Sequence, residues 1–309
     1  MTRMLLKALL LGGLALSATT RADAQRRDRD RDRDDRVTRL DTTLTISRNG
    51  IVELEGPSGE MTVSGWNRDE VRIVATSDGG ALRLDATASR IQLKCVGMGS
   101  DDVRYEVSVP IGTRLLLNGR STDVSVRGTR GDVEVQTQNG DIAILGAANV
   151  DVNALNGDVE LESVEEVRVN LVAGDVRIDS ARGPIRAMAV SGDIEMHNAQ
   201  SRNVTAQTTS GEVFYDGTID PSGRYDFTSH SGNVTVRVPA DVSAAVSLQS
   251  YAGEIESDFP ITIQGGATIS GHPRTFDFRI GNGGARITMN SFSGSVVLER
   301  AGSSNRQED

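Results

Sequence analysis

The hydrophobic positions of this chain alternate with polar ones in short stretches, and these stretches return at a regular interval. From about residue 120, a small or polar residue, a glycine and an acidic residue precede two apolar residues that flank a polar one, as in Arg130–Val135, Asn156–Leu161 and Ser191–Met196. Residues two apart share one face of a strand, so the apolar positions point inward together. Beyond the first residues, the pattern predicts strands and no helix.

The glycines of this phrase set the period of the repeat. Their separations are 17, 17, 18, 19, 21 and 21 residues, and the glycines are Gly140, Gly157, Gly174, Gly192, Gly211, Gly232 and Gly253. Each period also holds a second alternating stretch, such as Val150–Val152 or Val204–Ala206, so one period predicts strand, bend, strand and bend. A fixed period of this size is typical of a solenoid, whereas a β-sandwich would not keep the spacing so regular.

We therefore predict an all-β chain folded as a β-solenoid or β-helix, with two strands per coil of about 17–21 residues. Glycine is expected at each bend because a positive φ, or the close approach of the next coil, excludes a Cβ atom. The repeats are expected over residues 121–300. Residues 38–120 repeat less clearly, and we expect them to form an N-terminal β region or cap, because an open solenoid end needs covering.

Within the N-terminal region, one turn signal is distinct. Two alternating stretches, Leu44–Ile46 and Val52–Leu54, flank Arg48–Gly50. An Asn-Gly pair between alternating hydrophobic stretches favours a β-hairpin. We expect the two stretches to pair with each other.

The two ends of the sequence lie outside this pattern. Residues 1–24 have the features of a signal peptide, with Arg3 and Lys7 near an apolar stretch of 11 residues, Ala8–Ala18, and small residues before the expected cleavage point. That stretch is shorter than the about 20 residues of a membrane-spanning helix, although a retained N-terminal anchor is an alternative. Residues 25–37 are expected to be a disordered Arg/Asp-rich spacer, and 301–309 a disordered tail. We expect an exported protein of the periplasm or the cell surface.

Charge and cysteine content narrow the range of partners. The net charge is −10, and loss of Arg3, Lys7, Arg21 and Asp23 with the signal peptide makes it −12. A chain of this charge is not expected to bind nucleic acid or anionic lipid, and no stable membrane insertion is expected after cleavage. Cys95 is the only cysteine, so stability must come from the core and the strand ladder.

The acidic residue of the repeat is the main candidate for chemistry. Stacked coils would align these residues about 5 Å apart, and they include Asp141, Asp158, Asp175 and Asp193. A column of like charges could bind Ca²⁺, which prefers several oxygen ligands. Alternatively, each carboxylate accepts hydrogen bonds from its own bend, as Asp commonly does after a turn. Because Asn233 replaces the acid without loss of the repeat, we favour the second interpretation and expect no metal or cofactor.

No catalytic constellation is evident. His197, His230 and His272 are isolated and lack metal-ligand spacing, and His197 and His230 are expected on solvated corners. We expect no catalytic residues and no enzymatic activity. A polysaccharide-acting enzyme remains an alternative, because some solenoids carry clustered carboxylates on one outer wall.

Three phrases carry a resemblance to a known family: Gly59–Val63 with Gly65–Arg68, then Tyr105–Pro110, then the Gly-Asp-Val/Ile series. With these residues, the chain resembles the bacterial DUF4097 family of adhesin-like β-strand repeat proteins. The resemblance implies an exported solenoid and supplies no catalytic residue.

These observations predict an adhesin-like binding or interaction module of the cell envelope, with an envelope or surface ligand that is a glycan or a protein. The alternating polar residues of Thr205–Ser210 and Tyr225–Ser231 would suit such a ligand. The alternative is a periplasmic structural scaffold or an envelope-stress component that assembles end to end.

Overall fold

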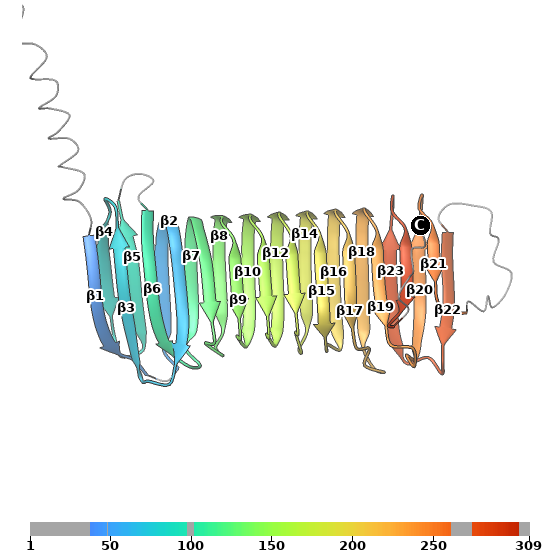
Figure 1. Ribbon diagram of the computed structural model, residues 1–309, viewed down its shortest axis with the longest axis horizontal. Coiled ribbons are helices and arrows are strands. Elements are labelled where there is room, and N and C mark those ends of the chain that lie inside the picture. Colours follow the sequence, from blue (N-terminus) through green and yellow to red (C-terminus); the bar gives the residue numbers. More distant parts are fainter. Residues whose placement is uncertain (1–37, 48, 98–101, 261–273, 303–309) are drawn as a thin grey trace, which may run out of the picture.

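The computed structural model describes residues 38–47, 49–97, 102–260 and 274–302. The predicted signal peptide and spacer, His272 and residues 303–309 of the predicted tail lie outside these residues. The described chain forms 24 strands in one continuous sheet that wraps round a long axis, with a small set of antiparallel strands at the N-terminal end (Figure 1). The all-β solenoid prediction is confirmed. The described ranges contain no helix with the length and apolar character that crossing a bilayer requires.

Two walls of the solenoid face each other across the core. The long strands β2 (Ile51–Trp66) and β7 (Arg114–Arg127) contribute their first part to one wall and their second part to the other. We call the first wall A. Besides these two parts, its strands in spatial order are β4 (Ala81–Ala86), β5 (Arg90–Val96), then β8 (Val133–Asn139), β10 (Asn149–Asn156), β12 (Glu166–Ala173), β14 (Ile185–Ser191), β16 (Asn203–Ser210), β18 (Arg224–Ser231), β23 (Ala285–Ser291), β20 (Ala244–Ser250) and β22 (Arg274–Ile280).

The opposite wall, wall B, continues each coil after its glycine bend. Besides the second parts of β2 and β7, its strands in spatial order are β1 (Thr38–Thr45), β3 (Glu70–Ser77), β6 (Asp102–Pro110), then β9 (Ile142–Leu145), β11 (Val159–Glu162), β13 (Val176–Asp179), β15 (Ile194–Ala199), β17 (Val213–Gly217), β19 (Val234–Val238), β24 (Val296–Arg300) and β21 (Ile255–Ser257).

The repeat of the sequence becomes the register of the parallel ladder. Val150 lies between Val133 of the preceding coil and Val167 of the next, and all three are buried. Like residues therefore stack into columns, and the inward columns of the two walls form one continuous core. Outward positions of the same strands alternate with them, so each wall presents its own columns of side chains to solvent.

Aromatic residues fill the core where the coils lengthen. The ring of Tyr215 on wall B lies 5.1 Å from that of Phe227 on wall A and 6.0 Å from that of Tyr225. Both tyrosines are fully buried, and each hydroxyl donates to a backbone oxygen, that of Tyr225 to Ser201 O at 2.6 Å. Burial raises the pKa of both phenols. Ala187 and Ala206 occupy the positions of Phe227 in the two preceding coils, which keeps the column within a narrow core.

At the N-terminal end, the hairpin prediction was wrong. The turn exists, since Gly50 N–H donates to Ser47 O at 2.8 Å, but the strands beside it do not pair with each other. Instead, β1 lies antiparallel to β3, and β2 lies parallel to β5, β6 and β7. The physical reason is burial, because β2 alternates buried residues such as Val52 and Met61 that need neighbours on both sides. A local turn signal does not specify those distant partners.

Both ends of the stack contain one coil out of sequence order. At the N-terminal end, β2 lies between the β5–β6 coil and β7, although it precedes both in the sequence. At the C-terminal end, the β23–β24 coil lies between the β18–β19 coil and the β20–β21 coil (Figure 1). The antiparallel strand β22 then covers the outer side of β20. Only the coils between these ends follow the chain in order.

Candidate functional site

The four aspartates that the repeat singled out lie in one column, one in each coil, at the bend from wall A to wall B. Each offers a carboxylate oxygen to the backbone of the next coil. Asp158 N–H donates to Asp141 Oδ1 at 3.0 Å, Asp175 N–H to Asp158 Oδ1 at 2.9 Å, and Asp193 N–H to Asp175 Oδ1 at 2.8 Å. The column therefore joins successive coils through charge-assisted hydrogen bonds.

The hydrogen bonds between coils continue where the column no longer consists of aspartate. Glu212 N–H donates to Asp193 Oδ1 at 2.7 Å, and Ser295 N–H donates to the amide oxygen of Asn233 at 2.9 Å. The sequence predicted bonds within each aspartate's own bend, whereas the donor in the structure belongs to the next coil, because stacking brings that N–H above the carboxylate. Within the described ranges, no three His, Cys, Asp or Glu side chains converge to hold a metal ion.

The bend glycines lie beside this column. Those from Gly140 to Gly232 have positive φ angles between +122° and +152°. A Cβ atom on Gly157 would lie 2.2 Å from the carbonyl oxygen of Gly140, so both predicted reasons for glycine apply. Gly253 has only the second reason, since its Cβ would lie 2.1 Å from Gly294 O. Gly294, from the out-of-order coil, thus separates Gly253 from Gly232.

The two described histidines lie on strands rather than corners, so their predicted placement was wrong. His197 is on β15 of wall B, and its ring lies 5.2 Å from that of Phe214. His230 is on β18 of wall A and stacks on Phe292, with 4.8 Å between ring centroids and 9° between planes. Each histidine occupies an outward position of the alternating pattern and packs against an aromatic ring of the neighbouring coil.

Both walls carry charged outward residues in the central coils, and those of wall A include Asp151, Arg168 and Arg186. On wall B such residues pair across strands, as Arg177 Nη1 does with Glu195 at 3.1 Å. A hydrogen bond from the Ser180 hydroxyl holds the pKa of the Asp179 carboxyl below its ordinary value. The sequence did not reveal that these groups share one face, because they are spread over several repeats. The outward charged residues of the central wall B strands are Glu160, Glu162, Arg177, Asp179, Glu195, Asp216 and Arg237.

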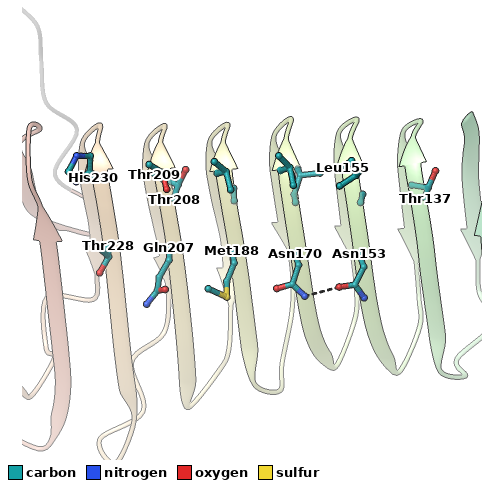
Figure 2. A pocket seen from close by; sticks show the side chains of 15 residues that line it. Thr137, Asn153, Leu155, Asn170, Met188, Gln207, Thr208, Thr209, Thr228 and His230 are labelled. Carbon is teal, nitrogen blue, oxygen red and sulfur yellow. Dashed lines mark hydrogen bonds between the residues drawn. The ribbon is translucent and has the colours of Figure 1, made fainter. Parts of the chain in front are cut away.

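Wall A is different, because it holds a groove of about 720 Å³ over the six strands β8, β10, β12, β14, β16 and β18 (Figure 2). None of the described residues that line it is Asp, Glu, Lys or Arg. The polar segments Thr205–Ser210 and Tyr225–Ser231 make up most of β16 and most of β18, and their residues line one end of the groove.

Two rows of outward side chains make up the groove. The amide row lies at mid-strand and consists of Asn153, Asn170, Met188, Gln207 and Thr228 (Figure 2). Two of its members bond to each other along the axis, since Asn170 Nδ2 donates to Asn153 Oδ1 at 3.0 Å, and Asn153 Nδ2 donates to Asp151 Oδ1 at 2.9 Å. These bonds fix the orientation of the two asparagine amides.

The second row, which we call the bend row, lies two residues further along each strand and consists of Leu155, Val172, Val190, Thr209 and His230. The first three are apolar, yet between 44% and 48% of each remains exposed. Exposed apolar residues that stand next to one another mark interaction surfaces more often than scattered ones do.

A second hollow of about 250 Å³ continues this surface beyond β18. Thr228 and His230 line both hollows, and the second adds residues of β23 and β20. Here the bend row becomes aromatic, because Phe292 stacks on His230 and Tyr251 stacks on Phe292 with 4.8 Å between centroids.

The bend row was not predicted from the sequence, although the sequence contains a signal for it. Leu155, Val172 and Val190 each lie two residues before a bend glycine. When the coils are aligned on their glycines, an apolar residue recurs at a position that the alternation assigns to solvent. The aromatic continuation could not be found this way, because the coil of Phe292 lies out of sequence order.

Comparisons with known proteins place the chain in a family. The model of the family named Toastrack DUF4097 matches residues 43–299. No curated protein matches the sequence significantly. A "putative cell adhesion protein" from Clostridium sporogenes is similar in structure at 8% identity, covering 85% of this chain and 100% of its own, with a TM-score of 0.23. A "putative adhesin" from Parabacteroides merdae is similar at 10% identity, covering 85% of this chain and 96% of its own, with a TM-score of 0.26. Since the family model spans most of the sequence, from β1 to β24, this chain belongs to the DUF4097 family.

Proposed function

We propose that this chain is an exported, non-catalytic binding module of the bacterial cell envelope, adhesin-like, and that the groove of wall A is its contact surface. The observation that carries the proposal is the groove itself, whose lining is uncharged and partly apolar on a chain of net charge −10. A face of this kind is suited to contact with a partner, because it loses little hydration on binding and its side chains are held by the sheet.

The groove also supports a binding role rather than catalysis. Among the described lining residues, His230 is the only side chain with an ordinary acid–base function, and it packs against Phe292. Hydrolysis of a glycosidic bond would require a pair of carboxyl groups facing the substrate. The carboxylates of wall A that lie beside the groove are each paired with an arginine: Glu134 with Arg114, Asp151 with Arg168 and Asp226 with Arg224.

The alternative of a scaffold that assembles end to end has less support. Such assembly needs an open coil end that can pair with another molecule. Antiparallel strands lie at both ends of wall A, β4 against β5 and β22 against β20. Light scattering of the mature protein tests this alternative, since a mass that rises with concentration would favour assembly.

The binding role is tested by a pair of matched substitutions. Leu155→Asp places a carboxylate in the groove, whereas Leu145→Asp places one on wall B, where Leu145 is 40% exposed against 48% for Leu155. We expect both variants to fold and only Leu155→Asp to lose binding of the labelled protein to isolated envelopes of the producing bacterium. Equal binding by both variants would contradict the proposal.

The location is tested separately, by protease treatment of intact and permeabilised cells. Digestion on intact cells would place the protein at the surface and favour adhesion between cells or to a host. Protection until permeabilisation would place it in the periplasm, where a ligand within the envelope is the better candidate. Recovery with the cytoplasmic fraction would contradict export.

A further inference from the structure

We infer that the groove of wall A binds a linear, uncharged polysaccharide whose chain runs along the axis of the solenoid. The inference rests on the proposed binding role of wall A and adds the chemical class of the ligand. Four features of the groove support it. They are the uncharged lining, the balance of hydrogen-bond donors and acceptors, the pairing of every strand on both sides, and the distance between coils.

The lack of charge excludes a strongly ionic ligand. Binding of an acidic or basic polymer is stabilised by complementary charges placed along its path. None of the described residues of the groove or of the adjoining hollow is Asp, Glu, Lys or Arg, although these residues make up 25% of the chain. Charged outward residues of wall A, such as Asp151, Arg168 and Arg186, lie one row further from the bend glycines. The uncharged strip is therefore confined to the amide row and the bend row.

The polar groups of the groove match hydroxyl groups. A side-chain amide both donates and accepts hydrogen bonds, as does the hydroxyl of threonine. Sugar hydroxyls do the same, so each can pair with the groove without leaving a donor or an acceptor unmatched. Asn153, Asn170 and Gln207 supply the amides, and Asn290 and Gln249 continue them in the adjoining hollow. The apolar side of a sugar ring can rest on the exposed Leu155, Val172 and Val190.

The backbone of the groove leaves no place for a peptide to add as a strand. Peptides are often bound by pairing with a free sheet edge. Every strand of the groove, from β8 to β18, is already paired on both sides. Recognition here depends on side chains alone, which suits a polymer that presents hydroxyls rather than peptide groups.

The repeat of the groove matches a polymer of sugar rings. Successive coils are ~4.8 Å apart, which is close to the length of one pyranose unit in an extended 1,4-linked chain. The amide row presents one outward side chain on each of the five strands β10, β12, β14, β16 and β18 (Figure 2). A linear glycan along the axis can therefore meet one side chain of this row at each unit.

The inference is tested by calorimetry with a panel of hexasaccharides. The neutral members are cello-, manno-, xylo- and chitohexaose, and hexagalacturonate is the charged member of similar length. We expect at least one neutral hexamer to bind, its trimer to bind more weakly, and hexagalacturonate not to bind. Asn170→Asp, which keeps the shape of the amide but adds a charge, and Leu155→Asp should each weaken binding about tenfold or more, while Leu145→Asp should leave it unchanged.

The outcomes separate this inference from the proposed function. If no neutral hexamer binds, but Leu155→Asp still abolishes binding to envelopes, the ligand is of another class and only the inference fails. If hexagalacturonate is the one hexamer that binds, the inference of an uncharged ligand also fails, while the proposed binding role stands. If envelope binding does not depend on the groove, the proposed function fails and the inference fails with it.

Discussion

At the residue scale, glycine and serine carry different bend conformations in this fold. The bend from wall A to wall B uses glycine with φ above +120°, as at Gly157. The bend that follows wall B uses left-handed residues that are not always glycine, including Ser163 at +54° and Ser180 at +57°. The first conformation is nearly restricted to glycine, whereas the second is strained but accessible to other residues.

Substitution of the bend glycines should separate backbone strain from steric contact. Gly157→Ala introduces both backbone strain and a steric clash, because φ is +122° and the new Cβ would lie 2.2 Å from Gly140 O. Gly112→Ala introduces backbone strain without a steric clash, since φ is +90° and nothing lies within 4 Å of the new Cβ. Gly253→Ala introduces a steric clash without this strain. We expect Gly157→Ala to lower the free energy of unfolding most, by roughly 3 kcal/mol, and Gly112→Ala by about 1 kcal/mol, in chemical denaturation. Equal losses in all three would argue against this division.

The opposite change should stabilise the other bend. Ser163→Gly removes the strain of a left-handed serine, which exceeds the entropy that glycine adds to the unfolded chain. We expect the free energy of unfolding to rise by about 0.5–1 kcal/mol, measured by urea denaturation. The reverse substitution, Gly146→Ser at the equivalent bend with φ +73°, should lower it by a similar amount. A loss of stability in Ser163→Gly would show that its side chain has a role beyond the bend.

At the element scale, the aspartate column links the coils at the bend from wall A. Its hydrogen bonds require only an acceptor oxygen, as Asn233 demonstrates with Ser295 N–H. Asp158→Asn keeps that oxygen and removes one of several aligned charges, so we expect unchanged or slightly higher stability. Asp158→Ala leaves the N–H of Asp175 without its partner and should lower the free energy of unfolding by about 1 kcal/mol. Thermal melting of the two variants decides between a hydrogen-bonding and a charge-dependent role.

The calcium hypothesis predicts the opposite result for the same column. A ligand that binds only the folded state raises the melting temperature. Because one oxygen of each aspartate is engaged by the next coil, we expect millimolar Ca²⁺ and chelator to give the same melting temperature. A rise with Ca²⁺ that Asp158→Asn abolishes would instead support a cation site.

The elements that could be predicted from the sequence are those whose partners lie one period away. Val150 pairs with Val167 because each lies ten residues after a bend glycine, so period, inward face and bend glycines were all accessible. The position of β23–β24 in the stack could not be predicted, because Ser293–Leu298 has the pattern of a further coil and nothing in it specifies β18 as its neighbour. Pairing of distant strands depends on which surfaces need covering, and local sequence does not encode that. Part of the groove, at Thr205–Ser210, could be predicted from polar alternation, whereas its apolar row required the coils to be aligned.

At the scale of the whole molecule, the out-of-order coil should control the stability of the C-terminal end. A chain that ends after Gly284 lacks β23 and β24, so β18 and β20 lose the neighbour that they share, together with buried Ile287 and Leu298. We expect the melting temperature to fall by roughly 10 °C or more. A chain that ends at Gly302 removes only polar tail residues and should melt like the full protein. Hydrogen exchange should show the loss of protection in β18 to β22, and an unchanged melting temperature would contradict this role.

The same two out-of-order coils determine where the protein can change its length in evolution. A duplicated coil from the region of β8 to β17 begins and ends with the pairing pattern of its neighbours, so it can enter the stack without disturbing them. A coil added before β2 or after β24 would have no adjacent place, because the strands next to it in sequence are already enclosed on both sides. We therefore expect relatives of different lengths to differ by whole repeats in the middle of the chain. The groove of wall A would lengthen with each added repeat, while the two ends stay constant.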